Sequence, residues 1–313
     1  MSKVLEYVSS KPFLVVAEDD GEIVGGLLSN IVLGNSRIAP LRLFTEIRSN
    51  YGPLFLPEYA GVDRQIVSYA CRKMAETGYL SHYYVGYGDH ADILTRMGYK
   101  KSWSVSVASV VDLRKSTDEL FKSFDRDCRR GVKKAEKAGL RVEVVTDPHF
   151  PRVYHGILVA QAQRLGIRPE PYSFIQGIWD ILVPRDMARF YCAYYDEKPV
   201  AALIVLRYGK KVHGFLGCAL GEYLKLYPWN AMHWRAMQDA IREGMEEYDL
   251  MLSPGPEERN HPHYGLYLFK HGFGSRVIPL SVYIRRPLTI RRVFWDKIII
   301  RTFLKIPSLA RLV

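Results

Sequence analysis

Short apolar runs separated by turn residues open the chain. The runs Phe13–Ala17 and Ile23–Leu28 flank the acidic turn Glu18–Gly21, and this pattern predicts an antiparallel hairpin. Further apolar runs predict strands at 31–33, 37–44, 82–86 and 99–113, and helical patterns predict helices at 63–76 and 90–97.

A similar pattern returns after residue 140. It predicts strands at 140–145, 189–195, 199–207, 211–218, 248–252 and 276–284, and helices that begin near residues 148, 172 and 228. Pro228 suits the first turn of its helix. Trp234, Met237, Ile241 and Met245 follow at helical spacing. This stripe predicts a buried helix face rather than a cofactor-binding face.

The two parts of the chain align with each other. Residues 17–27 match 193–203 at an offset of 176, residues 70–78 match 236–244 at 166, and residues 94–99 match 268–273 at 174. Each part contains a hairpin, a long helix, a strand, a short helix closed by glycine and an aromatic residue, and a last strand. Such an internal repeat predicts two α/β halves of similar topology.

A basic segment separates the halves. Ser116–Glu119 has the spacing of a capping box, and the helix that follows stops at Gly139. Six cations fall on this helix: Arg126, Arg129, Arg130, Lys133, Lys134 and Lys137. They could bind phosphates, or they could be the solvated face of a linker helix, and the sequence leaves both open.

The stretch Gly265–Gly274 carries a lysine just before two glycines. Lys270 follows Phe269, and Gly272 and Gly274 flank Phe273. A helix C-terminus with a cation and a glycine stop explains this pattern. A functional lysine is the alternative.

The composition is that of an ordinary globular protein, 48% hydrophobic and 25% charged. No apolar run reaches the length of a membrane span, and the first residues do not form a signal peptide, so we expect a cytoplasmic protein. The four cysteines are far apart, and His261 and His263 lack partners at ligand spacing, so we expect neither disulfides nor a metal site. From Arg285 to Val313 eight basic residues stand against one acidic residue, so this tail carries +7 of the net charge of +11.

Four segments resemble a known family. They are Cys128–Gly139, Arg164–Arg168 followed by Tyr172, Tyr227–Trp234 continuing to Gly244 and to Tyr248 and Asp249, and Gly265–Gly274. They resemble the FemABX family of peptidoglycan interpeptide-bridge aminoacyltransferases, and the element order resembles a duplicated GNAT acyltransferase fold. The resemblance covers about residues 13–284 and is most specific in the last segment.

The resemblance implies a fold class and a division of the chain. We expect an α/β protein with mixed sheets and two tandem GNAT-like domains, 1–114 and 140–284. A basic helical connector, 115–139, would join them, and 285–313 would form a basic C-terminal helical tail.

The resemblance also implies an activity and a site. An aminoacyl group from aminoacyl-tRNA, or alternatively an acyl group from acyl-CoA, would pass to an amine of a lipid- or nucleotide-linked cell-envelope precursor, without a cofactor. Lys270 would stabilise the oxyanion or the donor phosphate, with Phe269 packed beside it. Arg164, Arg168 and Tyr172 would bind the substrate, and Arg129, Arg130, Lys133 and Lys134 would contact phosphates of the tRNA.

The sequence departs from the family in three places. Only about a dozen residues precede the first hairpin, the helical arm that some members insert between the halves is absent, and Ser253–Gly255 replaces the usual pair of glycines. These departures put some substrate contacts in doubt.

Two other functions stay open. The first is an acyl-CoA-dependent N-acyltransferase acting on a sugar or small amine. Gln163–Gly166 begins the pyrophosphate-loop motif of such enzymes, but Arg168 occupies its final small position. The second is a non-catalytic protein whose tail at 285–313 binds a membrane surface or nucleic acid. On a helix, however, the apolar and basic residues of that tail do not segregate cleanly. Packing of the tail on the first half is a further alternative.

Overall fold

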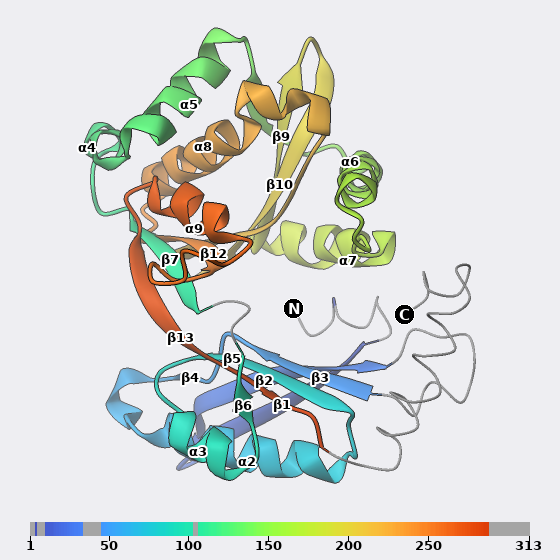
Figure 1. Cartoon of the computed structure of the whole chain (residues 1–313), viewed down its shortest axis with the longest axis vertical. Coiled ribbons are helices and arrows are strands. Elements are labelled where there is room, and N and C mark those ends of the chain that lie inside the picture. The colour runs from blue at the N-terminus through green and yellow to red at the C-terminus, as the bar shows by residue number, and fades with distance from the viewer. Residues whose placement is uncertain (1–3, 5–9, 34–44, 103–105, 288–313) are drawn as a thin grey trace. The chain divides into compact units, whose positions relative to one another are not determined.

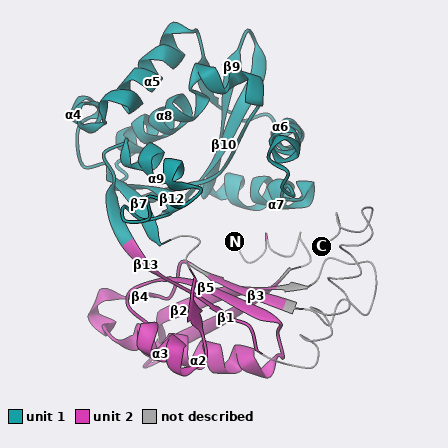
Figure 2. Ribbon diagram, in the orientation of Figure 1, with its two compact units in different colours: residues 1, 3, 105–278 teal, residues 2, 4–104, 279–313 magenta. Residues whose placement is uncertain are grey.

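The computed structural model describes residue 4 and the ranges 10–33, 45–102 and 106–287. The expected strand at 37–44 and the tail beyond residue 287 lie outside these ranges. The chain divides into two compact units (Figure 2). The C-terminal unit comprises residues 105–278, and the N-terminal unit comprises residues 4–104 with the chain from Pro279 onward. The units therefore interleave along the sequence.

The N-terminal unit is a mixed sheet with helices on one face. Its main strands run in the order β1 (Ser10–Asp19), β2 (Glu22–Leu33), β3 (Thr45–Asn50), β5 (Ser81–Tyr87) and β13 (Arg276–Arg285). Short strands β4 (Leu54–Phe55) and β6 (Lys100–Lys101) pair with β2 and β13. The helices are α2 (Val62–Glu76) and α3 (Ala91–Arg96). Val15, Leu27 and Ile47, one from each of β1, β2 and β3, form the core with Val67 and Met74 of α2.

The C-terminal unit has a longer mixed sheet. Its strands follow the order β7 (Val107–Asp112), β12 (Glu247–Ser253), β11 (Lys211–Ala219), β10 (Lys198–Tyr208), β9 (Ala188–Tyr195) and β8 (Arg141–Val144). Its α-helices are α4 (Thr117–Ser123), α5 (Arg126–Lys137), α6 (Phe150–Leu165), α7 (Tyr172–Leu182), α8 (Pro228–Arg242) and α9 (Tyr264–His271). Short 3₁₀ segments occur in this unit at Val183–Arg185 and Gly221–Leu226, and in the N-terminal unit at Pro57–Tyr59.

Both faces of the C-terminal sheet are covered by helices. Helices α5 and α8 lie on one face, and α6 and α7 on the other (Figure 1). The alternation along β9 shows this division. Tyr191 packs into the core under α8, whereas the ring of Phe190 meets Tyr154 of α6 and Trp179 of α7 at centroid distances of 5.6 and 4.9 Å. Side chains on successive strand positions point to opposite faces, so one strand serves two cores.

The basic segment is part of the core rather than a solvated linker. The predicted capping box at Ser116 and Glu119 is present at the start of α4. Helix α5 buries Cys128, Val132 and Ala135 in the cluster that includes α8. Only its other face is polar, as the amphipathic pattern requires.

The predicted repeat has a close structural counterpart. Helix α8 begins and ends 166 residues after α2, and β12 begins and ends 166 residues after β5. The last strands are exchanged between the repeats. The first half supplies β7, which pairs with β12, and the second half supplies β13, whose residues from Leu280 pair with β5. The stretch expected as one strand at 99–113 is thus two strands, β6 and β7.

Candidate active site

The two parallel strands β11 and β12 separate in the middle of the C-terminal sheet. They pair only from Lys211↔Glu247 to His213↔Asp249. Each strand then carries an irregularity, with Phe215 extra in the β11–β10 register and two residues of β12 opposite one of β7. Parallel strands normally pair along their whole length. Beyond this point, the backbone N–H and C=O groups of β11 and β12 no longer bond to one another.

Met251 marks the irregularity in β12. Its φ angle is 68°, in the left-handed region that non-glycine residues seldom adopt. Its N–H donates to Oδ1 of Asp249 at 2.7 Å, which holds the turn of the backbone in place. Strained backbone that is held in this way is common at functional sites.

Lys270 reaches this point from α9. Its side chain is buried, with the residue 7% exposed, and Nζ donates to the carbonyl oxygen of Leu252 at 2.5 Å. Phe269 and Phe273 of the same segment pack against each other and against the core, which fixes the helix. Burial lowers the pKa of Lys270 to about 8, although the carboxylate of Asp249 opposes this shift. A lysine in this state is largely protonated at neutral pH and can exchange its proton slightly above it.

A neutral histidine lies beside the lysine. His233 of α8 is buried, and its Nδ1 is 2.9 Å from the hydroxyl of Tyr248 on β12. Burial, with a contribution from the charge of Lys270, lowers the pKa of His233 to about 3. Gly214 makes room for this pair, since a Cβ there would lie 3.0 Å from Cε1 of His233. The lysine therefore has an uncharged imidazole as its neighbour.

A second histidine faces the carboxylate. Nδ1 of His213 lies 3.3 Å from Oδ2 of Asp249, and the His213 side chain is 27% exposed while that of Asp249 is fully buried. Residues His213, His233, Tyr248 and Asp249 were not predicted as site residues. His233, Tyr248 and Asp249 lie in one of the segments that resemble the family, and Asp249 is an acid within the apolar strand 248–252, where a carboxylate is seldom fully buried unless it is paired. No sequence signal was found for His213.

In the N-terminal unit the two corresponding parallel strands do not separate. Strands β3 and β5 pair over five positions, from Glu46↔Ser81 to Asn50↔Val85. Arg96, which aligns with Lys270, has a 75% exposed side chain and pairs with Asp92 inside α3. Within the described residues, the buried cation at a strand divergence belongs to the C-terminal unit alone.

The predicted substrate-binding residues lie elsewhere in the same unit. Arg168 is exposed on the connection between α6 and α7. The Tyr172 hydroxyl donates to Gln176 at 2.6 Å within α7. Arg164 lies in the last turn of α6 and packs on Gly221, just after β11. Lys270 and Phe269 are therefore together at the strand divergence, and the roles of the other three residues stay predictions.

The predicted phosphate-binding residues of α5 differ in their surroundings. Arg129 donates to the carbonyl oxygens of Lys122 and Phe124, at the end of α4. Arg130 pairs with Asp127 at 3.2 Å. The Lys134 ammonium lies 5.4 Å from the ring centre of Tyr227, and Lys133 is exposed. Lys133 and Lys134 are thus the two with the most accessible charge.

The segment considered as a pyrophosphate loop is not a loop. Gln163 and Arg164 are helical, and Gly166 caps α6 with a φ angle of 67°. The turn from β11 into α8 is instead the 3₁₀ segment Gly221–Leu226, followed by Tyr227 at a φ angle of 57° and by Pro228. Proline has no N–H to offer an anion at this helix start.

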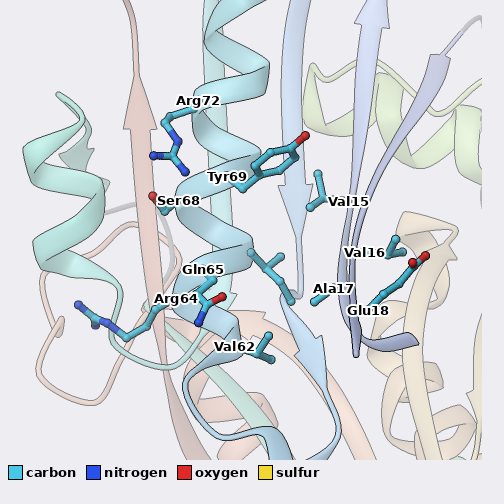
Figure 3. A pocket seen from close by; sticks show the side chains of 11 residues that line it. Val15, Val16, Ala17, Glu18, Val62, Arg64, Gln65, Ser68, Tyr69 and Arg72 are labelled. Carbon is cyan, nitrogen blue, oxygen red and sulfur yellow. The ribbon is translucent and has the colours of Figure 1, made fainter. Parts of the chain in front are cut away.

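A separate cavity of about 610 Å³ lies in the N-terminal unit, between β1 and α2 (Figure 3). Val15, Ala17, Tyr69 and Arg72 are among its lining residues. None of the predicted site residues lines it, and the cluster around Lys270 is not part of it.

The described part of the chain has neither a metal-binding cluster nor a membrane-spanning helix. Its residues contain no group of three or more His, Cys, Asp or Glu side chains placed to hold a metal ion. They also contain no helix that is both long and apolar enough to cross a membrane. The cysteines are buried thiols.

A known family model matches part of the chain. Residues 122–260 match the family model of the acetyltransferase (GNAT) domain. The match contains β11, α8 and β12 and ends ten residues before Lys270. No curated protein sequence matches the chain.

Solved structures with the same fold agree with this match. The crystal structure of FemX superposes with a TM-score of 0.68 at 14% identity, over 95% of this chain and 92% of that chain. L-PGS from Bacillus licheniformis gives 0.60 at 12% identity over 93% and 88%. A tandem GNAT protein from the clavulanic acid biosynthesis pathway gives 0.58 at 13% identity over 90% and 85%. The expected fold class, mixed α/β with two tandem GNAT-like domains, is therefore confirmed, apart from the C-terminal helix, which lies outside the described residues.

Proposed function

We propose that this protein is an aminoacyltransferase that moves an aminoacyl group from aminoacyl-tRNA to an amine of a cell-envelope precursor. The observation that carries the proposal is Lys270, a buried ammonium held at the strand divergence of a GNAT-type domain. Similarity in fold to FemX and to L-PGS supports this direction, and the residues quoted above for the FemABX resemblance support it independently.

The chemistry needs a fixed positive charge. When an amine attacks the ester carbonyl of the donor, negative charge develops on the carbonyl oxygen. Lys270 has used one N–H on Leu252, and an ammonium has three. In a site with little water its charge stabilises an oxyanion far more than it would at the surface. Phe269 holds the helix in place, and the neutral state of His233 avoids a competing cation.

The start of α8 favours a tRNA donor over acyl-CoA. The 3₁₀ segment before α8 uses the N–H groups of Tyr223 and Tyr227 on Leu220 and Leu224, and Pro228 has none. Pro228 therefore removes one of the N–H groups that a helix start can offer to a pyrophosphate. Lys133, Lys134 and Arg130 are the proposed contacts to tRNA phosphates, and Arg164, Arg168 and Tyr172 are proposed to bind the acceptor.

The acyl-CoA-dependent N-acyltransferase is the second candidate, because the matching family model is that of an acetyltransferase domain. The experiment is a transfer assay with charged tRNAs and acyl-CoAs in parallel, against lipid-linked and nucleotide-linked envelope precursors. Transfer from tRNA supports the proposal. Transfer from acyl-CoA alone, or CoA found by mass spectrometry in the purified protein, would replace it with the second candidate.

A matched pair of variants tests the site. Lys270→Ala is expected to lower the transfer rate on the order of 100-fold or more. Arg96→Ala alters the aligned position of the first half, where the cation is exposed, and should leave the rate unchanged. Full activity of Lys270→Ala would refute the site. A protein that transfers nothing from either donor would favour the non-catalytic alternative, and sedimentation with anionic vesicles would then test binding through 285–313.

A further inference from the structure

The acceptor amine must lose a proton when it becomes an amide, and Lys270 is a poor receiver because it is largely protonated at neutral pH. A second group is needed to accept that proton. The candidates are the titratable side chains at the divergence of β11 and β12: His213, His233, Tyr248 and Asp249.

Three of these candidates are unsuitable. The buried ring of His233 has its Nδ1 at Tyr248 and packs with the rings of Phe269 and Phe273, at centroid distances of 6.0 and 5.8 Å. Tyr248 is buried with its hydroxyl on that same histidine. Asp249 is fully buried and accepts the N–H of Met251.

His213 differs from these three in being accessible. It is next to Val212, which is in the core under α8, so the side chain of His213 points to the other face of the sheet. It is the last residue of β11 that pairs with β12, opposite Asp249, where these two strands separate. The buried carboxylate lies at Nδ1, and more than a quarter of the side chain is open to solvent.

The surrounding charges favour one form of this imidazole. Asp249 faces Nδ1, Lys270 is close to the same carboxylate, and the pair of Lys211 and Glu247 lies two residues back at 2.7 Å. A carboxylate at Nδ1 favours a proton on that nitrogen, which leaves the lone pair of Nε2 free. Contacts of this kind are often long in a site without substrate and shorten when it binds.

We propose that His213 is the general base of the transfer and that Asp249 is its positioning residue. This inference rests on the proposed function. The amine nitrogen attacks the ester carbonyl carbon, the C–N bond forms, and the proton of the amine passes to Nε2 of His213. The C–O bond to the ribose then breaks, and the imidazolium returns the proton to the departing oxygen. Lys270 stabilises the oxyanion between these two steps.

The decisive variant is His213→Asn. The asparagine amide can still donate toward Asp249, but no acceptor remains at the position of Nε2. Loss of a general base typically slows a reaction by about 10² to 10⁴-fold, and we expect that loss in single-turnover transfer, with donor binding unchanged. The acidic limb of the pH–rate profile should disappear, and added imidazole should restore part of the rate. His149→Asn, at an exposed histidine at the start of α6, is the control and should behave as the wild type.

Nuclear magnetic resonance of ¹⁵N-labelled histidine gives a readout that needs no activity. The His213 signals, assigned by their loss in His213→Asn, should show the Nδ1–H tautomer, and Asp249→Asn should weaken that preference. An Nε2–H tautomer in the wild type overturns the proposal, as does a His213→Asn variant that retains the wild-type rate and pH profile. Wild-type protein that transfers nothing from any donor overturns the proposed function and the role of His213 with it. Transfer that is lost in Lys270→Ala and kept in His213→Asn overturns the role of His213 alone.

Discussion

Nζ of Lys270 donates a hydrogen bond of 2.5 Å to the carbonyl oxygen of Leu252. Leu252 directly follows Met251, whose left-handed backbone marks the irregularity of β12. The irregularity and the lysine therefore depend on each other. Leu252 lies beyond the last residue of β12 that pairs with β11, and its carbonyl oxygen accepts the hydrogen bond of the buried ammonium.

The pKa of Lys270 sets a limit on activity at high pH. Because burial lowers this pKa to about 8, the protonated form is lost as the pH rises through that value. Transfer that needs the charge should therefore fall on the alkaline side of about pH 8. In Lys270→Arg any remaining activity should lose this alkaline limb, since a guanidinium does not deprotonate in this range. A pH–rate profile of both proteins checks this, and an unchanged limb in the arginine variant would assign it to another group.

Acid should destabilise the protein through its buried histidines. The folded-state pKa of His233 is about 3, below the ordinary value of 6.5, so between these values the unfolded chain binds more protons. The free energy of unfolding is then highest above pH 6.5 and is lost as the pH falls toward 3, at up to about 1.4 kcal/mol per pH unit. His82 contributes in the same direction, with a pKa also lowered to about 3 by burial.

His233→Gln removes one of these two contributions. The slope of unfolding free energy against pH should fall by about one proton between pH 3 and 6.5, whatever the change in absolute stability. Urea unfolding at several pH values measures this slope. His149→Gln, at an exposed position, should leave it unchanged, and an unaltered slope in His233→Gln would mean that this histidine is not buried in its neutral form.

The fold was predictable because its signals are local and repeated. Apolar runs bounded by turn residues predicted the strands β1, β9 and β10, and the aligned segments predicted that α2 and α8 occupy the same place in each half. The exchange of β7 and β13 could not be predicted in this way. The strands of both halves have similar apolar patterns, so the pattern does not say which sheet each one joins.

The site was only partly predictable, for a related reason. Lys270 and Phe269 lie within one short segment whose sequence can be matched to a family. His213, His233 and Asp249 come from three separate elements, β11, α8 and β12. The folded chain places the charge of Lys270 near Asp249 and His233, and His213 against Asp249. Each looks like an ordinary polar residue when it is read alone along the chain. Arg129 shows the opposite case, because a cation that fits a phosphate-binding pattern donates to the backbone of α4.

Two glycines in the C-terminal unit should respond in opposite ways to alanine. A Cβ at Gly217 would overlap the ring of Trp229, and such overpacking costs about 1–3 kcal/mol. Gly156 lies on the exposed face of α6 with no atom within 4 Å of an added Cβ. Gly156→Ala should therefore stabilise by about 0.5–1 kcal/mol through helix propensity. Thermal and urea unfolding measure the stability change of each variant. A stabilising effect of Gly217→Ala would show that the indole of Trp229 moves freely.

Variants of α5 should separate the cations that hold the fold from those proposed to bind tRNA. Arg129 donates to two carbonyl groups at the end of α4, so Arg129→Ala should lower the free energy of unfolding by about 1 kcal/mol or more. Lys133→Ala and Lys134→Ala lie at exposed positions and should change it by less than about 0.5 kcal/mol.

If the donor is aminoacyl-tRNA, the two lysine variants should instead weaken tRNA binding and flatten its dependence on salt, since each phosphate contact releases a counterion. Filter binding at several salt concentrations measures this effect. Equal tRNA affinity in the lysine variants and the wild type would remove α5 from the proposed tRNA surface, whereas wild-type stability in Arg129→Ala would contradict its structural role.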